Sequence, residues 1–198
     1  MLDALWLTIF QRLSAGVAHE LRNSLNGVAV NLEVVRSRSG RDGVAASALG
    51  SFAASASEQL EQVIAMTEAL VALGRPARSP AAIGRCADQV AILLRPPLVA
   101  NGGRLDLVVE GEGTTRVPAD AARTFVAAAL CAAVESAGEA GEVRCLVRPA
   151  NGVELQVEGG FAAPPRLAME IERAAAELAV GVRSTASGIT LTFPAQGG

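Results

Sequence analysis

The chain has one histidine among 198 residues, and its neighbours supply a carboxylate and an amide. Glu20 follows His19 directly, and Asn23 comes one helical turn after the histidine. Residues four positions apart lie on the same face of a helix, so the imidazole and the amide would project side by side. A carboxylate next to an exposed imidazole can hold one tautomer and leave the other ring nitrogen available as a nucleophile. These residues make His19 a candidate nucleophile, and the alternative at this point is a surface histidine without a chemical role.

The composition excludes several other kinds of site. All 17 basic residues are arginines, which removes lysine Schiff-base chemistry and the lysine of a phosphate-binding loop. A single histidine cannot form a histidine-rich metal site. Cys86, Cys131 and Cys145 are widely spaced in apolar surroundings, which is typical of buried thiols in a reducing compartment. The net charge of −3 gives no electrostatic basis for binding nucleic acid or an anionic membrane.

The apolar N-terminus also lacks the features of a targeting segment. Residues 1–10 have no basic leading region and no small-residue cleavage site, so we expect no signal peptide. The longest uncharged apolar run, Phe125 to Val134, is too short to span a bilayer. We expect a soluble, cytoplasmic chain without a membrane partner.

Two long helices are predicted to position the histidine. Apolar residues recur in steps of three and four from Leu21 onward and again from Leu49 onward, as in a coiled-coil seam. Between them, residues 37–43 contain two glycines and no apolar residue, which predicts a turn. The second helix should end near Gly74. The seam residues are Leu21, Leu25, Val28, Leu32 and Val35, followed by Leu49, Phe52, Ala56, Gln59, Val63, Met66, Leu70 and Leu73.

This hairpin would bury its seam poorly on its own, so we expect a second copy to complete a dimeric four-helix bundle. His19 lies about 160° around the helix from Leu21 and should point outward. Gln59 is the one polar residue of the second seam. It either sets the register of the seam or lies at the end of the bundle.

The second half of the chain predicts an α+β fold with a sheet covered by helices on one face. Strands are expected at 104–110, at 142–148 and 153–158 as a hairpin, and at 183–185 and 188–193 as a closing hairpin. Helices are expected at 83–100, kinked or ended by Pro96 and Pro97, at 119–137 and at 165–180. We therefore predict a helical hairpin over residues 1–75, a linker at 76–80 and an α/β domain over 81–198.

The string His19-Glu20-Leu21-Arg22-Asn23, placed in the first helix of a hairpin, resembles the H-box of sensor histidine kinases. The resemblance implies that His19 accepts a phosphoryl group and that Glu20 is its acid–base partner. It also implies that Asn23 orients water when such proteins dephosphorylate response regulators. Ser24 departs from the pattern, because the family usually has a helix-kinking proline there.

The order of elements after the hairpin is similar to the ATP-binding α/β sandwich of these kinases, the GHKL or Bergerat type, but its nucleotide residues are missing. The helix at 119–137 lacks the asparagine that holds Mg²⁺ in the family, and Gly159 stands where the adenine-binding aspartate is expected. Phe161 and Ala163 replace two loop glycines, and a glycine-rich lid is absent. The resemblance thus implies a degenerate ATPase-like domain, and we expect no ATP and no cofactor bound by this chain.

Our leading hypothesis is a histidine phosphotransferase that relays a phosphoryl group between receiver-domain aspartates through His19, without ATP. The partner receiver domain would supply the Mg²⁺ that neutralises the phosphoryl charge. Two alternatives remain: a response-regulator phosphatase that depends on Asn23, and a non-catalytic dimeric adaptor that binds a receiver domain. An ATP-dependent kinase is disfavoured because its nucleotide residues are missing.

Overall fold

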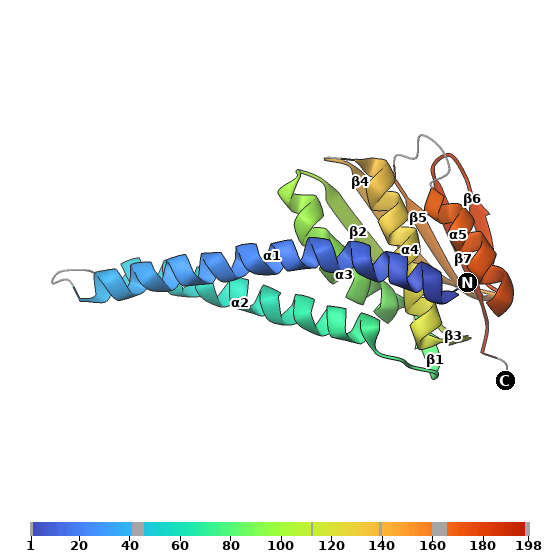
Figure 1. The fold of residues 1–198 in the computed structure, drawn as a ribbon, viewed down its shortest axis with the longest axis horizontal. Helices are drawn as coiled ribbons and strands as arrows, with labels where there is room; N and C mark the ends of the chain where they lie inside the picture. Colours follow the sequence, from blue (N-terminus) through green and yellow to red (C-terminus); the bar gives the residue numbers. More distant parts are fainter. Residues whose placement is uncertain (1, 41–45, 112, 139, 160–165, 197–198) are drawn as a thin grey trace.

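The computed structural model describes residues 2–40, 46–111, 113–138, 140–159 and 166–196 (Figure 1). The chain forms the predicted succession of a helical hairpin and an α/β part. Its elements are α1 (Leu2–Ser39), α2 (Ala46–Gly74), β1 (Pro80–Ala82), α3 (Ile83–Ala100), β2 (Arg104–Val109), β3 (Thr114–Pro118), α4 (Ala119–Ala137), β4 (Glu142–Ala150), β5 (Gly152–Glu158), α5 (Arg166–Ala175), η1 (Ala176–Leu178), β6 (Gly181–Ser184) and β7 (Gly188–Pro194).

The two long helices run antiparallel, and their far ends project well beyond the α/β part (Figure 1). The helix α1 continues through Ser39, so it enters the first part of the predicted turn, and residues 41–45 lie outside the described ranges. No described helix combines the length and apolar character needed to cross a membrane.

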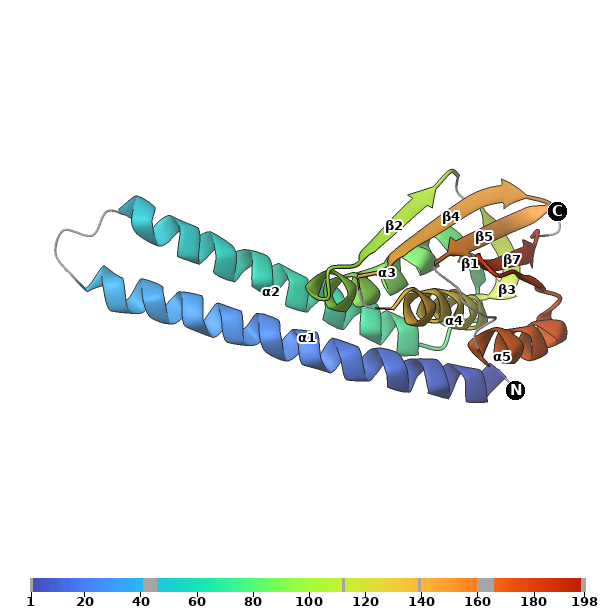
Figure 2. The same cartoon turned by 90° about the horizontal axis from the view of Figure 1, so that it is seen from above.

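The main sheet has five strands in the order β2-β4-β5-β7-β6. The β2–β4 pair is parallel, and the remaining pairs are antiparallel, including the predicted β4–β5 and β6–β7 hairpins. Alternate residues point inward, as Val153, Leu155 and Val157 do on β5. The helices α3, α4 and α5 cover that one face (Figure 2), which confirms the predicted α+β architecture.

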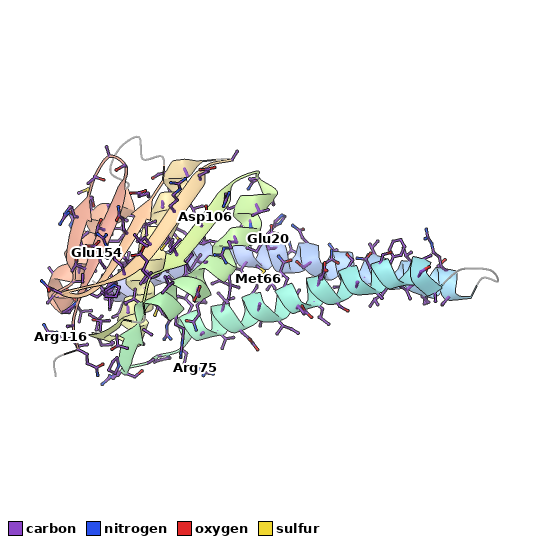
Figure 3. The ribbon with its side chains drawn as sticks, turned by 180° about the vertical axis from the view of Figure 1, so that it is seen from behind. Glu20, Met66, Arg75, Asp106, Arg116 and Glu154 are labelled. Carbon is purple, nitrogen blue, oxygen red and sulfur yellow. The ribbon has the colours of Figure 1, made fainter. Side chains whose placement is uncertain are left out.

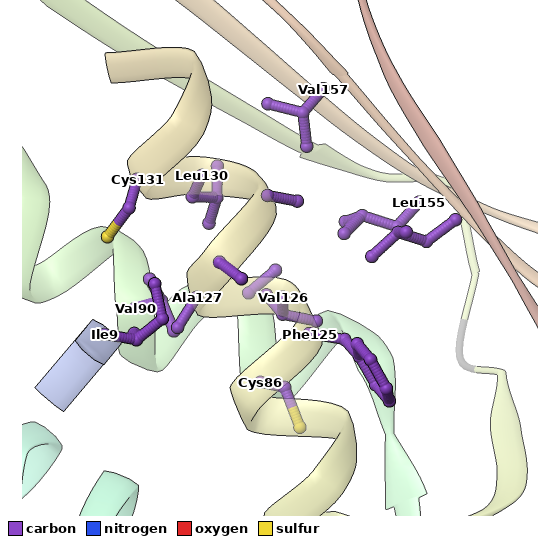
Figure 4. Packing of buried hydrophobic residues seen from close by; sticks show 14 of the residues in the cluster. Ile9, Cys86, Val90, Phe125, Val126, Ala127, Leu130, Cys131, Leu155 and Val157 are labelled. Carbon is purple, nitrogen blue, oxygen red and sulfur yellow. The ribbon is translucent and has the colours of Figure 1, made fainter. Parts of the chain in front are cut away.

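The core continues from the sheet through α4 into the first half of α1. Leu5, Ile9, Leu13 and Val17 recur every four residues on α1, and each is at most 3% exposed. Figure 4 shows Leu155 and Val157 pointing from the sheet toward α4, while Ile9, Val90 and Cys131 lie on the other side of that helix. The α1 stripe therefore packs on the layer of α3 and α4, a contact that the seam pattern did not predict.

A tight junction links α2 to the α/β part. The guanidinium of Arg123 on α4 donates a hydrogen bond to the carbonyl of Arg75, just past the end of α2. The carboxylate of Asp120 accepts a hydrogen bond from the backbone nitrogen of Ala77 at 3.3 Å. A cation at a helix C-terminus is electrostatically favourable, so Arg123 anchors the end of α2. The predicted domain boundary in this region stays a prediction.

The helix α3 has the predicted bounds and contains Pro96 and Pro97, so this pair does not end the helix before Ala100. Two other details differ from the sequence-based expectations. The helix predicted at 165–180 ends at Ala175 and continues as η1. A small antiparallel sheet of β1 and β3 was not predicted, since its strands are too short to show a periodic pattern.

Candidate functional site

His19 lies near the middle of α1, where the hairpin leaves the α/β part, and its side chain is exposed. Within the described part of the chain, its imidazole has no hydrogen-bond or ion-pair partner. The outward direction agrees with the helical spacing predicted from Leu21, which is half-buried. Both ring nitrogens are therefore available to a docked partner.

The other two predicted residues contact each other. Asn23 is exposed, and its Nδ2 donates a hydrogen bond to Oε1 of the half-buried Glu20 at 3.5 Å. Figure 3 labels Glu20 on α1, next to the α/β part. The carboxylate thus meets the amide of Asn23 in this structure, and its predicted acid–base role toward His19 stays a prediction.

The residue in the usual proline position, Ser24, is buried at 8% exposure. The helix α1 runs through this position as one α-helix from Leu2 to Ser39. Ser24 keeps a backbone N–H that proline lacks, so the helical hydrogen bonding can continue. The orientation of His19 is therefore coupled directly to the helix on both sides of it.

Arg12 lies on the same face of α1 as His19, because seven positions are close to two helical turns. Its Nη1 donates to Oε2 of Glu135 on α4 at 2.6 Å, and the two side chains are 44% and 62% exposed. A cavity of about 350 Å³ adjoins this ion pair. Sequence reasoning missed Arg12 because its partner is 123 positions away, and no local signal marks such a pair.

In the region that the resemblance assigns to a nucleotide, the end of α4 and the residue after β5 contact other parts of the chain. Glu135, at the C-terminal end of α4, is paired with Arg12. A β-carbon built on Gly159 would lie 3.0 Å from the carbonyl oxygen of Ala133 on α4. A side chain at position 159 therefore requires the α4 backbone at Ala133 to shift by a few tenths of an ångström. The substitutions at Phe161 and Ala163 lie outside the described residues.

The cysteines are buried and carry no described disulfide. Burial raises the pKa of Cys86 to about 11 and the pKa values of Cys131 and Cys145 to about 12. These thiols are neutral near pH 7, so they are poor nucleophiles and poor metal ligands. Among the described residues, no group of three or more His, Cys, Asp or Glu side chains is placed to hold a metal ion.

The projecting part of the hairpin exposes a set of large aliphatic side chains. Each is between 47% and 63% exposed in the single chain: Leu25, Val30, Leu32, Leu60 and Ile64, with Val71 nearer the α/β part. Leu25 and Leu32 belong to the predicted seam, and the hairpin alone leaves both in solvent. This exposure agrees with the expectation that a lone hairpin buries its seam poorly.

A polar layer interrupts the contact between the two hairpin helices. Nδ2 of Asn31 on α1 lies 3.2 Å from Oγ of Ser55 and 3.2 Å from Oε1 of Gln59 on α2. The Gln59 amide lies against Gly27. Gln59 was singled out by its place in the seam, whereas its partner Asn31 carries no comparable signal in the sequence.

Comparison with known proteins gives only distant likenesses. No protein-family model and no curated protein matches the sequence. Among solved structures, the histidine kinase AdeS of Acinetobacter baumannii is 14% identical with a TM-score of 0.47, over 90% of this chain and 98% of that chain. A bacterial phosphotransferase is 12% identical with a TM-score of 0.45, over 93% and 95%. Full-length ShkA in complex with AMPPNP is 22% identical with a TM-score of 0.46, over 95% and 47%. Likenesses of this size assign neither a family nor a function to the chain.

Proposed function

We propose that the chain is a histidine phosphotransferase of a two-component phosphorelay, with His19 as the phosphoryl carrier. The observation that carries the proposal is the exposed, unpartnered imidazole of His19 inside an H-box-like string on a long helix. Buried contacts of the same helix with α3 and α4 fix the surroundings of the imidazole. The substrates are the phosphoaspartate of one receiver domain and the free aspartate of another.

In the forward step, a neutral ring nitrogen of His19 attacks the phosphorus of the receiver's phosphoaspartate. A nitrogen–phosphorus bond forms, the acyl phosphate bond breaks, and the aspartate leaves as a carboxylate. The proton on the other ring nitrogen becomes more acidic, and Glu20 accepts it after rotating away from Asn23. The partner receiver domain would supply Mg²⁺ to neutralise charge on the phosphoryl oxygens. The reverse reaction delivers the group to a second receiver.

Operation without ATP is supported by the residues of the degenerate domain. Gly159 packs against the carbonyl of Ala133 where the resemblance implies an adenine-binding aspartate. Glu135 is paired with Arg12, and α4 carries no asparagine. Phosphate binding needs cationic groups, a metal or clustered backbone amides. The one arginine of α4, Arg123, is buried and donates a hydrogen bond to the carbonyl of Arg75 at the end of α2.

A homodimer is supported by the exposed aliphatic residues of the hairpin. Leu25 and Leu32 on α1 and Leu60 and Ile64 on α2 would be covered by a second copy packed as a four-helix bundle. Full burial of a large aliphatic side chain contributes roughly 1.5–3 kcal/mol. These side chains are about half-exposed in the single chain, so each would contribute about half of that to a dimer, and several from each copy would add up.

The proposal is tested by incubating the chain with a receiver domain carrying ³²P on its aspartate. We expect label on the wild-type chain, an acid-labile bond typical of phosphohistidine, and onward transfer to a second receiver. His19→Ala should accept no label, whereas Ser37→Ala, an exposed change on the same helix, should behave as wild type. Transfer through His19→Ala at the wild-type rate would overturn the proposal.

A response-regulator phosphatase is the second candidate, favoured by the exposed amide of Asn23 one turn from His19. In that case Asn23 would orient a water molecule toward the phosphoaspartate, and His19 would carry no phosphoryl group. Release of free phosphate without labelled chain, lost in Asn23→Ala, would support this function. The adaptor alternative predicts receiver binding with neither label nor phosphate release.

A further inference from the structure

The polar layer of the hairpin lies close to His19 along α1 and is built from four half-buried residues: Gly27, Asn31, Ser55 and Gln59. Gly27 is eight positions beyond His19, about 12 Å along the helix. Nδ2 of Asn31 reaches Ser55 and Gln59 on α2, each at 3.2 Å. Hydrogen-bonded polar groups in an apolar interface favour one register of the two helices. If one helix slid along the other, these groups would lose their hydrogen-bond partners.

Gly27 is part of this arrangement because its missing side chain makes room for a partner. A β-carbon built there would overlap the terminal amide of Gln59. The Gln59 side chain therefore lies across the α1 backbone at Gly27 while its Oε1 accepts from Asn31. Glycine lowers helix stability relative to alanine. Gly27 therefore makes α1 locally less stable, and in return it leaves room for the Gln59 side chain.

On the other side of His19, α1 is held by different contacts. Leu13 and Val17 are at most 3% exposed, and Arg12 is paired with Glu135 on α4. His19 thus lies on a segment of α1 that is fixed to the α/β part before it and to α2 after it. A shift of α1 at the polar layer would change the direction of the imidazole relative to α2.

We propose that Gly27, Asn31 and Gln59 are positioning residues that set the register of α1 on α2 and so the direction in which His19 meets its partner. This inference rests on the proposed function. The inference adds a functional role for residues that touch neither His19 nor the phosphoryl group. Transfer between two bound groups is sensitive to misplacement of about 1 Å, which can cost about 100-fold in rate.

Gly27→Ala separates positioning from stability. Alanine favours the helix, so the melting temperature should stay the same or rise, while the new methyl group displaces the Gln59 amide from Asn31. We expect the rate of label transfer from a ³²P-labelled receiver to fall about 10-fold or more. Gly50→Ala is the matched control, because a β-carbon at Gly50 meets nothing within 4 Å. It should transfer at the wild-type rate.

Two further variants test the hydrogen bond itself. Gln59→Leu removes the acceptor of Asn31 and should slow transfer as Gly27→Ala does. Gln59→Glu keeps an acceptor oxygen of similar reach and should retain transfer near the wild-type rate. Phosphoramidate, a small phosphodonor that needs only an accessible imidazole, should label His19 equally in all four variants. Transfer at the wild-type rate by both Gly27→Ala and Gln59→Leu would overturn the inference and leave the proposed function standing.

A structural measurement keeps the inference testable if the wild-type chain accepts no label and the proposed function fails. Spin labels at Arg22→Cys and Glu61→Cys, both exposed, report the position of α1 against α2. Protein without the added cysteines checks that the buried native thiols stay unlabelled. The distance distribution should shift or broaden with Gly27→Ala and stay unchanged with Gly50→Ala. An identical distribution in all backgrounds would overturn the inference.

Discussion

Nη1 of Arg12 lies 2.6 Å from Oε2 of Glu135, and this ion pair joins the first helix of the hairpin to α4 across 123 positions of sequence. It belongs to a larger contact in which the buried stripe of α1 packs on α3 and α4. Because Arg12 shares a face of α1 with His19, the α/β part lies beside the segment that carries the histidine.

The Arg12–Glu135 ion pair should contribute little to stability despite its short distance. Both side chains are substantially exposed, and such pairs typically contribute 0–1 kcal/mol. Arg12→Ala and Glu135→Ala should each lower the free energy of unfolding by less than about 1 kcal/mol in urea denaturation. A double-mutant cycle should give a small coupling free energy that decreases further at high salt. A coupling of several kcal/mol would show that the pair is more buried in solution.

The apolar contact of α1 with the α/β part should contribute far more. Leu13 is 3% exposed, and Leu13→Ala should lower the free energy of unfolding by about 2–5 kcal/mol through lost burial and the cavity left behind. Leu7→Ala removes the same atoms from a side chain that is 50% exposed on the same helix. Its effect should stay within about 1 kcal/mol. Equal effects of the two variants would contradict the observed packing.

Restoring an acidic residue at position 159 should not restore nucleotide binding. Gly159→Asp places a β-carbon 3.0 Å from the carbonyl oxygen of Ala133, so the α4 backbone must shift by a few tenths of an ångström to accept it. We expect no measurable affinity for an ATP analogue by calorimetry. We also expect a loss of about 1–3 kcal/mol in the free energy of unfolding. Gain of nucleotide affinity by this single change would argue against the proposed operation without ATP.

Alkaline pH should destabilise the fold through the buried cysteines. Their thiols ionise near 9.0 in the unfolded chain, whereas burial raises the native pKa of Cys86 to about 11 and those of Cys131 and Cys145 to about 12. Above pH 9 the unfolded state therefore binds fewer protons than the native state, and stability falls as pH rises toward 11. Each thiol accounts for up to about 1.4 kcal/mol per pH unit in this range.

This pH dependence is measurable because the chain contains neither lysine nor tyrosine, the other side chains that titrate in that range. Urea unfolding at pH 8 and pH 10 should show the loss. Cys145→Ala removes one of the three thiols, so the free energy of unfolding should decrease less steeply with pH than in the wild-type chain. A free energy of unfolding that is constant from pH 8 to pH 10 would contradict the burial of these groups.

The exposed aliphatic residues of the hairpin should control assembly. Leu25→Glu together with Ile64→Glu places charges on side chains that are each 50% exposed in the single chain. Both substitutions should leave the folded monomer intact, as measured by circular dichroism, and shift the sedimentation coefficient from dimer to monomer. Val108→Glu, on a 53% exposed position of the sheet, is the control and should leave the dimer unchanged. An unchanged dimer in the hairpin variant would place the interface elsewhere.

Much of the fold could be predicted because its signals are local. The helix at 119–137 begins and ends where the sequence predicts, and the β4–β5 and β6–β7 hairpins follow their turn residues and alternating patterns. The outward direction of His19 follows from its spacing to Leu21 on one helix. Local patterns also gave the bounds of α3, although Pro96 and Pro97 lie inside it. They missed the small sheet of β1 and β3, whose strands are too short to show a period.

Taken alone, the sequence determined which residues share a helix face or alternate on a strand, since those relations depend only on the 3.6- and 2-residue periods of the backbone. It thereby placed His19, Glu20 and Asn23 together on one exposed segment. Only the tertiary structure decided which distant groups meet: Arg12 with Glu135, Gly159 with Ala133, and Asn31 with Gln59. These contacts depend on how whole elements pack. That packing is a collective property of the buried apolar surfaces, and no short stretch of residues encodes it.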